Sequence, residues 1–234
     1  MIKKVIFFNI IFSLYLYSII YSQNQYYDFS VAVIRYSGGG DWYSYQTSMK
    51  NLLRYVKEDL KLNTPEREKV LRLTDPELYR YPFIFITGHG NIRFSEREIQ
   101  ILRRYLLAGG FLWADDDYGM DKSFRREMKR VFPELDFIKL PSNHKIFNCF
   151  YRLKGLPKIH KHNGKPPEAL ALKYNGRILV LYTYESNISD GLDDPEIHND
   201  PEYKRILAKK MAINIVYYFF YYNYPNKYID FSIK

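Results

Sequence analysis

Short polar segments rich in carboxylates and glycines follow several apolar runs of the chain. They include GGGDW at 38–42, GHGN at 88–91 and DDDYG at 115–119. Carboxylates and imidazoles bind cations and transfer protons, and glycines let a backbone approach a ligand closely. The candidate site residues of this kind are Asp41, His89, Asp115, Asp116, Asp117 and Glu185. The candidate ligand loops add Gly38, Gly39, Gly40, Gly88, Gly90, Asp190 and His198.

Two of these segments also have a purely structural interpretation. The glycines at 38–40 either allow a turn with positive φ or cradle an anion with their backbone N–H groups. His89, between two glycines, is either a general base or ligand, or a cap for the segment that follows it.

The three consecutive aspartates cannot all point the same way. In an extended segment, Asp115 and Asp117 share one face and Asp116 lies on the other. Crowded carboxylates repel, so they need a cation, a shared proton, solvent or the start of a helix. The cofactor is therefore unknown, with a divalent metal ion as the candidate. No catalytic residue and no set of metal ligands follows from the sequence.

Other reactive residues favour structural roles. His160 and His162 have the spacing of a metal pair, but the sequence places no third ligand beside them. Cys149 has apolar neighbours, which predicts a buried, inert thiol. A basic stripe predicts a solvated helix face, with an anionic partner as the alternative; nucleic acid is not expected. The stripe consists of Lys122, Arg125, Arg126, Lys129 and Arg130.

The composition excludes several classes of protein. A chain of 234 residues that is 47% hydrophobic and 26% charged is neither disordered nor collagen-like. Its single cysteine excludes an internal disulfide framework and the Cys-rich zinc modules. The 24 tyrosines accompany abundant Lys, Ile, Asn and Phe, which indicates compositional drift rather than a tyrosine-rich binding surface.

The first 22 residues predict export. Lys3 and Lys4 precede an uncharged apolar run at 5–22, as in a secretory signal peptide. The run is also long enough to serve as a membrane anchor. We therefore expect a periplasmic or membrane-anchored protein whose residues 23–234 form a single domain.

The remainder alternates predicted strands and helices. Apolar runs predict strands at 29–36, 70–73, 83–87, 111–114 and 136–140. Apolar residues at helical spacing, with capping signals, predict helices at 49–60, after Asp75-Pro76, at 95–108 and at 124–132. Short connections between them imply right-handed crossovers and a mostly parallel sheet.

The second half adds a hairpin, an insertion and a last helix. Asn175-Gly176 joins two apolar runs and predicts a β-hairpin. The Pro-, His- and Lys-rich segment 141–168 predicts a loop-rich insertion. Asp200-Pro201 opens a helix whose apolar run, 211–222, is too short to span a bilayer, so we expect a buried core helix. Because ligands bind beyond the carboxyl ends of parallel strands, Asp41, His89, Asp116 and Glu185 should meet at one edge of the sheet.

Several longer motifs resemble a bacterial family, the domain of unknown function numbered 4159. They are GGGDWY (38–43), YPFIFITGHGNIRFS (81–95), LRRYLLAGGFLWADDDYGMDKSFRREMKRVFPE (102–134), GLPKIHKHNGKPPEALAL (155–172) and YTYESNISDGLDDPEIHNDP (182–201). The resemblance covers about 29–222. It implies the fold of the class I glutamine amidotransferase-like superfamily, an α/β flavodoxin-like three-layer sandwich. Family members are typically exported or membrane-anchored and encoded near MoxR-type ATPases and von Willebrand A-type proteins, which implies a functional link to them.

The resemblance also bears on activity. Active amidotransferases of that superfamily carry a nucleophilic Cys on the turn that corresponds here to Asp115–Asp117. A carboxylate attacks an amide far less readily than a thiolate does, so glutamine hydrolysis by the usual mechanism is not expected. Three functions remain: a non-catalytic ligand- or protein-binding domain of the cell envelope, a hydrolase with or without a metal at the carboxyl edge of the sheet, or a structural subunit of a membrane-associated assembly.

Overall fold

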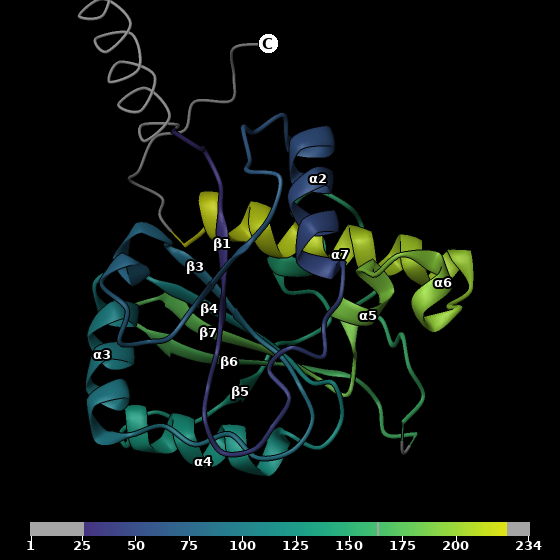
Figure 1. Cartoon of the computed structure of the whole chain (residues 1–234). Helices are drawn as coiled ribbons and strands as arrows, with labels where there is room; N and C mark the ends of the chain where they lie inside the picture. The colour runs from purple at the N-terminus through teal and green to yellow at the C-terminus, as the bar shows by residue number, and fades with distance from the viewer. Residues whose placement is uncertain (1–25, 163, 224–234) are drawn as a thin grey trace, which may run out of the picture.

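Seven strands form one mixed β-sheet at the centre of the protein (Figure 1). The computed structural model describes residues 26–162 and 164–223. The strands are β1 (Val31–Ile34), β2 (Lys69–Leu71), β3 (Phe83–Ile86), β4 (Phe111–Asp115), β5 (Ile138–Lys139), β6 (Glu168–Tyr174) and β7 (Arg177–Tyr184). The helices are α2 (Ser48–Leu60), α3 (Glu96–Leu107), α4 (Asp121–Val131), α5 (Ile188–Leu192), α6 (Pro195–His198) and α7 (Glu202–Tyr221), with 3₁₀ helices η1 (Pro76–Arg80) and η2 (Lys145–Phe147).

The sheet is mostly parallel, as the short strand–helix connections predict. Its order is β2-β1-β3-β4-β7-β6-β5, and the first five strands in that order run parallel to one another. Strand β6 is antiparallel to both of its neighbours and joins β7 through the predicted hairpin turn. Asn175 and Gly176 have φ values of 48° and 79°, as a type I′ turn requires.

Helices cover both faces of the sheet, which makes the fold a flavodoxin-like three-layer sandwich. Helices α2, α5 and α7 lie on one face, and α3 and α4 on the other (Figure 1). Alternate residues of β3 supply the two cores. Phe83 and Phe85 pack on the α7 side, and Ile84 and Ile86 on the α3–α4 side. Burial on both faces explains why this strand is apolar throughout.

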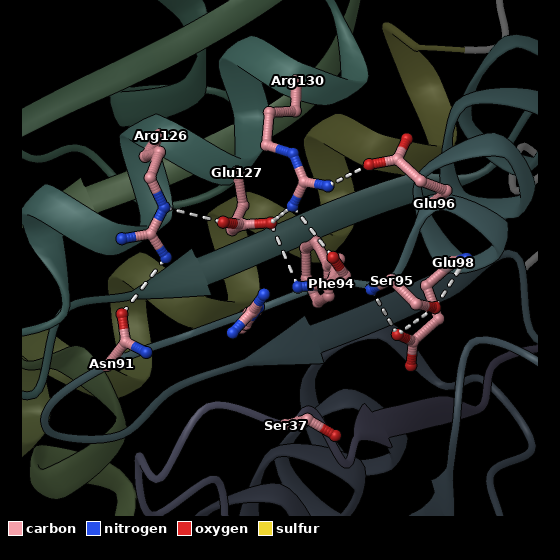
Figure 2. Close-up of a pocket in the computed structure, with 10 residues that line it drawn as sticks. Ser37, Asn91, Phe94, Ser95, Glu96, Glu98, Arg126, Glu127 and Arg130 are labelled. Atoms are coloured by element: carbon pink, nitrogen blue, oxygen red, sulfur yellow. Dashed lines mark hydrogen bonds and ion pairs between the residues drawn. The ribbon is translucent and has the colours of Figure 1, made fainter.

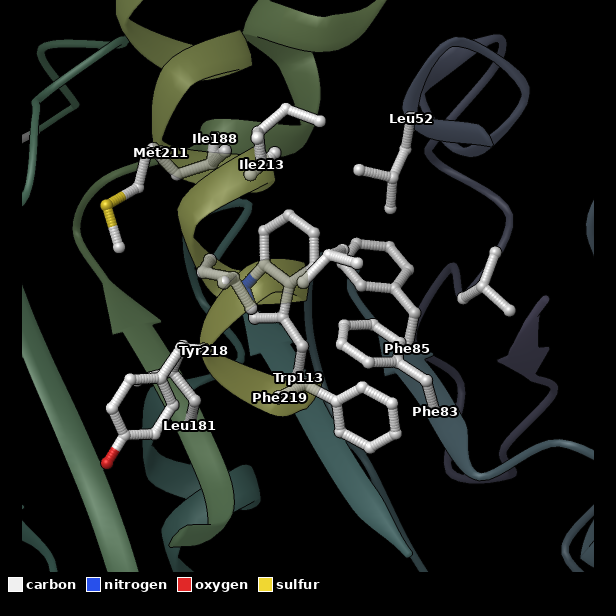
Figure 3. Close-up of a cluster of buried hydrophobic side chains, with 14 of the residues drawn as sticks. Leu52, Phe83, Phe85, Trp113, Leu181, Ile188, Met211, Ile213, Tyr218 and Phe219 are labelled. Carbon is white, nitrogen blue, oxygen red and sulfur yellow. The ribbon is translucent and has the colours of Figure 1, made fainter. Parts of the chain in front are cut away.

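Aromatic packing on the α7 side holds the carboxyl end of β4 in place. The Trp113 ring centroid lies 5.0 Å from that of Phe85 (Figure 3). Its indole Nε1 donates a hydrogen bond of 3.0 Å to Thr183 Oγ1 on β7. This bond joins β4 to β7 two residues before the acidic turn begins.

Helix α7 is a buried core helix, as predicted. Its residues 211–216 are all buried, including the polar Asn214. The Asn214 side chain is satisfied because Oδ1 accepts from Tyr151 N at 2.7 Å and Nδ2 donates to Tyr151 O at 2.8 Å. Among the described residues, no helix combines the length and apolarity needed to cross a bilayer. The predicted export segment, 1–22, lies outside those residues.

Local signals confirm some predicted elements and correct others. Ser95 and Glu98 form the predicted capping box of α3. After Asp75-Pro76, however, the chain forms the 3₁₀ helix η1, and the Asp75 carboxylate accepts from Arg72 N instead of capping. Helices α5 and α6 were not predicted, because segment 188–198 is too short to show an apolar period.

Candidate functional site at the carboxyl edge of the sheet

The loops after four adjacent parallel strands meet at one edge of the sheet. Asp41 follows β1, His89 follows β3, Asp117 follows β4 and Asn187 follows β7. These strands are neighbours in the order β1-β3-β4-β7 and run the same way, so their carboxyl ends lie side by side. The structure thus brings together groups that are up to 146 positions apart (from Asp41 to Asn187) in the sequence.

His89 is held by two carboxylates. Its Nδ1 lies 3.0 Å from Asp41 Oδ2 and 3.4 Å from Asp117 Oδ2, and its backbone N–H donates to Asp41 Oδ1. The His89 side chain is 52% exposed, whereas that of Asp117 is 7% exposed. Burial lowers the pKa of His89, but Asp117 and Asp41 outweigh that effect and raise it overall. The arrangement presents a carboxylate-bound imidazole to solvent.

The glycine loops allow the chain around His89 and the chain around Asp41 to touch. Gly40 N donates to Asn91 O at 2.9 Å, and Asp41 N donates to His89 O at 3.2 Å. A Cβ on Gly40 would lie 2.7 Å from His89 O, which is too close for any other residue. Close approach of two backbones therefore explains this glycine. Because the N–H of Gly40 already donates to Asn91 O, it is not available to cradle an anion.

The three aspartates alternate in direction, as an extended segment requires. Asp115 Oδ2 accepts from Ser189 N at 2.6 Å, and Asp117 Oδ1 accepts from Asn187 Nδ2 at 3.0 Å. Asp116 points the other way, where its Oδ2 accepts from Glu185 N at 3.3 Å. The residue that meets His89 is therefore Asp117 and not the central Asp116. The side-chain alternation of β4 continues through the turn.

Burial raises the pKa of all three aspartates. It raises that of Asp115 to about 7, and those of Asp116 and Asp117 to about 6. Hydrogen bonds oppose this rise at each site, but desolvation of the charged carboxylate is the larger effect. Asp116 is the least satisfied, because its buried Oδ1 has no hydrogen-bond partner among the described residues.

Asp190 connects the His89 side of the edge to two further histidines. Asn187 Nδ2 lies 2.6 Å from Asp190 Oδ2 and also bonds Asp117. His160 Nδ1 lies 3.0 Å from the same Asp190 oxygen, and His198 Nε2 lies 3.7 Å from Asp190 Oδ1. One donor atom from each of His160, Asp190 and His198 lies within 4.8 Å of the other two, a separation that suits a shared metal ion.

Two further carboxylates contact these histidines. His160 Nε2 lies 2.9 Å from Asp200 Oδ2, and His198 Nε2 lies 3.1 Å from Asp193 Oδ2. The hydrogen bond to Asp190 and the charges of Asp190 and Asp200 raise the pKa of His160 to about 9. The sequence pointed to Asp190 and His198 as ligand-loop residues but did not join them to His160. The HKH and HNDP segments, both within the motifs of the family resemblance, are the signal that could have done so.

His162 does not form the metal pair that its spacing with His160 resembles. Its ring stacks on that of Tyr118, with centroids 5.0 Å apart, and its ring centroid is 5.8 Å from that of His160. Burial lowers the pKa of His162. The histidine that joins His160 at Asp190 is instead His198, 38 positions further on.

Glu185 lies at the same edge but does not join His89. Its carboxylate is 2% exposed and pairs with Lys158 Nζ at 2.9 Å. Glu185 and Asn187 have φ values of 55° and 62°, in the left-handed region. Such backbone strain in residues other than glycine often accompanies functional loops. Here it turns Asn187 towards Asp117 and Asp190.

The basic stripe of α4 is largely solvated, as predicted, and four of its five residues also form ion pairs. Arg126 Nε and Arg130 Nη1 bond the two oxygens of Glu127 at 2.8 and 2.6 Å (Figure 2). Arg125 pairs with Asp121, and Lys129 with Asp136. A surface pocket of about 760 Å³ lies beside this network. Its lining residues are Ser37, Asn91, Arg93, Phe94, Ser95, Glu96, Glu98, Arg126, Glu127 and Arg130.

Cys149 is half-buried and packs with the α7 core. Its Sγ lies 3.3 Å from Asn214 O, and burial raises the pKa of the thiol to about 11. A thiol with a raised pKa is a poor nucleophile at neutral pH.

We expect Cys149→Ala to preserve any binding or activity. It should lower the free energy of unfolding by no more than about 1–2 kcal/mol, because few buried atoms are lost. Urea denaturation followed by circular dichroism measures the change. Loss of all function in a variant that still folds would assign Cys149 a chemical role.

Comparison with known proteins places the chain in a family without assigning it an activity. No curated protein matches the sequence. The model of the domain of unknown function DUF4159 matches residues 30–220, which include β1, nearly all of α7 and every residue of the site described above. The chain therefore belongs to the DUF4159 family.

Proposed function

We propose that this DUF4159 protein is a ligand-binding domain of the cell envelope, and that its ligand binds around Asp41, His89 and Asp117. The observation that carries the proposal is the half-exposed His89 ring held between two carboxylates. The envelope location rests on the basic start and apolar run of residues 1–22. A functional link to MoxR-type ATPases and von Willebrand A-type proteins belongs to the same proposal.

The chemistry of the site favours a ligand that carries positive charge or several hydrogen-bond donors. Asp41 is one-third exposed and Asp117 lies just beneath, so both can accept from a ligand that reaches His89. The edge is acidic although the whole chain carries a formal charge of +9. Such a local contrast attracts cationic groups such as a primary amine.

The same residues argue against glutaminase chemistry of the amidotransferase-like kind. The turn after β4 offers Asp116, which is 1% exposed and directed away from His89. The one thiol, Cys149, bonds a backbone carbonyl of α7. Neither group combines a nucleophile with an adjacent base, as covalent catalysis requires.

Ligand-observed NMR against a panel of primary amines, amino sugars and neutral sugars tests the proposal. We expect amine-bearing members to bind, and Asp117→Asn to weaken binding by about tenfold, since a charged hydrogen bond is worth roughly 1.5–3 kcal/mol. Asp136→Asn is the matched control, because Asp136 is an exposed aspartate paired with Lys129. If the Asp117→Asn and Asp41→Asn variants bound the amines as tightly as the natural protein does, the proposal would be contradicted.

A hydrolase is the second candidate, and one feature of His89 favours it. A carboxylate on Nδ1 orients an imidazole so that Nε2 can act as a general base. Hydrolysis of p-nitrophenyl acetate or p-nitrophenyl phosphate that is abolished by His89→Gln, with binding retained, would favour this function. Unchanged background rates in that variant would leave binding as the function.

A further inference from the structure

We propose that His160, Asp190 and His198 bind a divalent first-row transition metal ion. The proposal goes beyond the ligand site around His89, and it stands whether or not an amine binds there. The three residues come from the 141–168 insertion, from α5 and from α6, so the insertion has a defined role in this site. Figure 1 shows α5 and α6 next to each other at the end of α7.

The donor atoms lie close enough together for a metal site, because one atom from each residue lies within 4.8 Å of the other two. His160 Nδ1 lies 3.0 Å from Asp190 Oδ2, and His198 Nε2 lies 3.7 Å from Asp190 Oδ1. Tetrahedral zinc with bonds of about 2.0–2.1 Å places its ligand atoms about 3.3 Å apart. Small side-chain adjustments therefore bring all three donors onto one ion.

The buried amide of Asn187 independently points to a cation-binding site between His160 and Asp190. Its Nδ2 carries two hydrogens, yet it lies 2.6 Å from Asp190 Oδ2, 3.0 Å from Asp117 Oδ1 and 3.1 Å from His160 Nδ1. Asn187 is 0% exposed, and its Oδ1 has no partner among the described residues. A metal ion bound to His160 Nδ1 removes the need for a hydrogen bond between this nitrogen and the amide, whichever of the two would donate.

A neighbouring carboxylate orients His160 as a metal site requires, and a second one lies beside His198. Asp200 Oδ2 lies 2.9 Å from His160 Nε2, so Nδ1 faces Asp190, where a metal ion would replace its proton. Asp193 is fixed by Thr47 N at 2.6 Å, and its other oxygen lies 3.1 Å from His198 Nε2. Because this nitrogen is also the one that faces Asp190, Asp193 is placed to be a fourth ligand.

The donor set selects the class of metal. Two imidazoles with one carboxylate suit Zn²⁺, Co²⁺, Ni²⁺ or Fe²⁺, whereas Mg²⁺ and Ca²⁺ prefer oxygen ligands only. The histidine side chains are each 25% exposed and that of Asp190 is 6% exposed. The site is thus open on one side, where a water or a ligand group can complete the coordination.

Titration of the EDTA-treated and dialysed full chain with Zn²⁺ and Co²⁺ tests this site. We expect one ion per chain by calorimetry, visible absorption bands from bound Co²⁺, and little heat with Mg²⁺. Asp190→Asn and His198→Gln should each weaken Zn²⁺ binding by more than about 100-fold, because even outer-shell partners are worth about 10–100-fold. Asp200→Asn should have an intermediate effect.

Two histidine variants serve as controls. His144 lies at the start of η2, where its Nδ1 accepts from Ile146 N, so His144→Gln should leave Zn²⁺ affinity unchanged. His89→Gln should also leave it unchanged, because His89 is not one of the three proposed ligands; loss of amine binding in Asp41→Asn with unchanged Zn²⁺ affinity separates this proposal from the ligand site. If Asp190→Asn fails to fold, the more exposed His198→Gln carries the test. The proposal is overturned if the natural protein does not bind Zn²⁺ stoichiometrically, or if a folded His198→Gln variant binds Zn²⁺ as tightly as the natural protein.

Discussion

The free energy of unfolding of this protein should be highest near pH 4 and should fall by several kcal/mol as the pH rises to 7. Asp115 titrates with a pKa of about 7 in the folded protein, against a usual value of 3.8. Between these values the unfolded chain loses this proton while the folded protein keeps it, so rising pH favours unfolding. A difference of three pKa units corresponds to about 4 kcal/mol for this residue alone.

Asp116, Asp117 and His89 act in the same direction. Burial raises the pKa values of Asp116 and Asp117 to about 6, so their contribution is lost between about pH 4 and 6. The raised pKa of His89 stabilises the fold below the ordinary histidine value, and that contribution is lost as the pH rises through its folded value. Most proteins instead gain stability over this range.

Urea denaturation at pH 4, 5.5 and 7 measures the profile. In Asp116→Asn the free energy of unfolding should vary less with pH. At pH 7 it should equal or exceed that of the natural protein, because the variant removes a buried charge with an unbonded oxygen. Asp136→Asn, at an exposed ion pair, should reproduce the natural profile. Stability that stays level or increases from pH 4 to 7 would show that these aspartates are ionised at their usual pKa values.

Glu127→Ala should lower the free energy of unfolding by about 1–3 kcal/mol, the usual cost of leaving a buried hydrogen-bonding group without a partner. Glu127 is 1% exposed and holds three donors: Phe94 N at 3.0 Å, Arg126 Nε at 2.8 Å and Arg130 Nη1 at 2.6 Å (Figure 2). Its removal leaves the backbone N–H of the buried Phe94 without an acceptor. The loop from β3 to α3 would then lose one of its attachments to α4, while the bonds of Ser123 and Arg126 to Ile92 remain.

Thermal and urea unfolding of three variants distinguish this role from a general loss of charge. Glu127→Gln should cost less than Glu127→Ala, since its amide oxygen can still accept from Phe94 N. Glu134→Ala removes a solvent-exposed partner of Arg103 and should change stability little. If Glu127→Ala were as stable as Glu134→Ala, the buried network would contribute nothing beyond a surface ion pair.

Sequence patterns predicted most of the fold, because the signals involved are local. The apolar run of β3, the capping box at Ser95 and the turn at Asn175-Gly176 each depend on a few neighbouring residues, and all three are present. The same reasoning failed where tertiary contacts decide the local structure. The short helix α5 forms where the chain packs against α7 and α2, and neither its residues nor those of α6 show a helical period.

The sequence by itself determined which chemical groups follow each strand, and therefore that carboxylates and histidines would gather at the carboxyl edge of a parallel sheet. Only the tertiary structure decided which of them touch. Asp117 rather than Asp116 meets His89, because strand alternation sets the direction of each side chain through the acidic turn. His160 and His198 meet at Asp190 because the insertion and α6 both fold onto this edge. Contacts between segments 38 residues apart depend on the path of the whole chain, which no local pattern records.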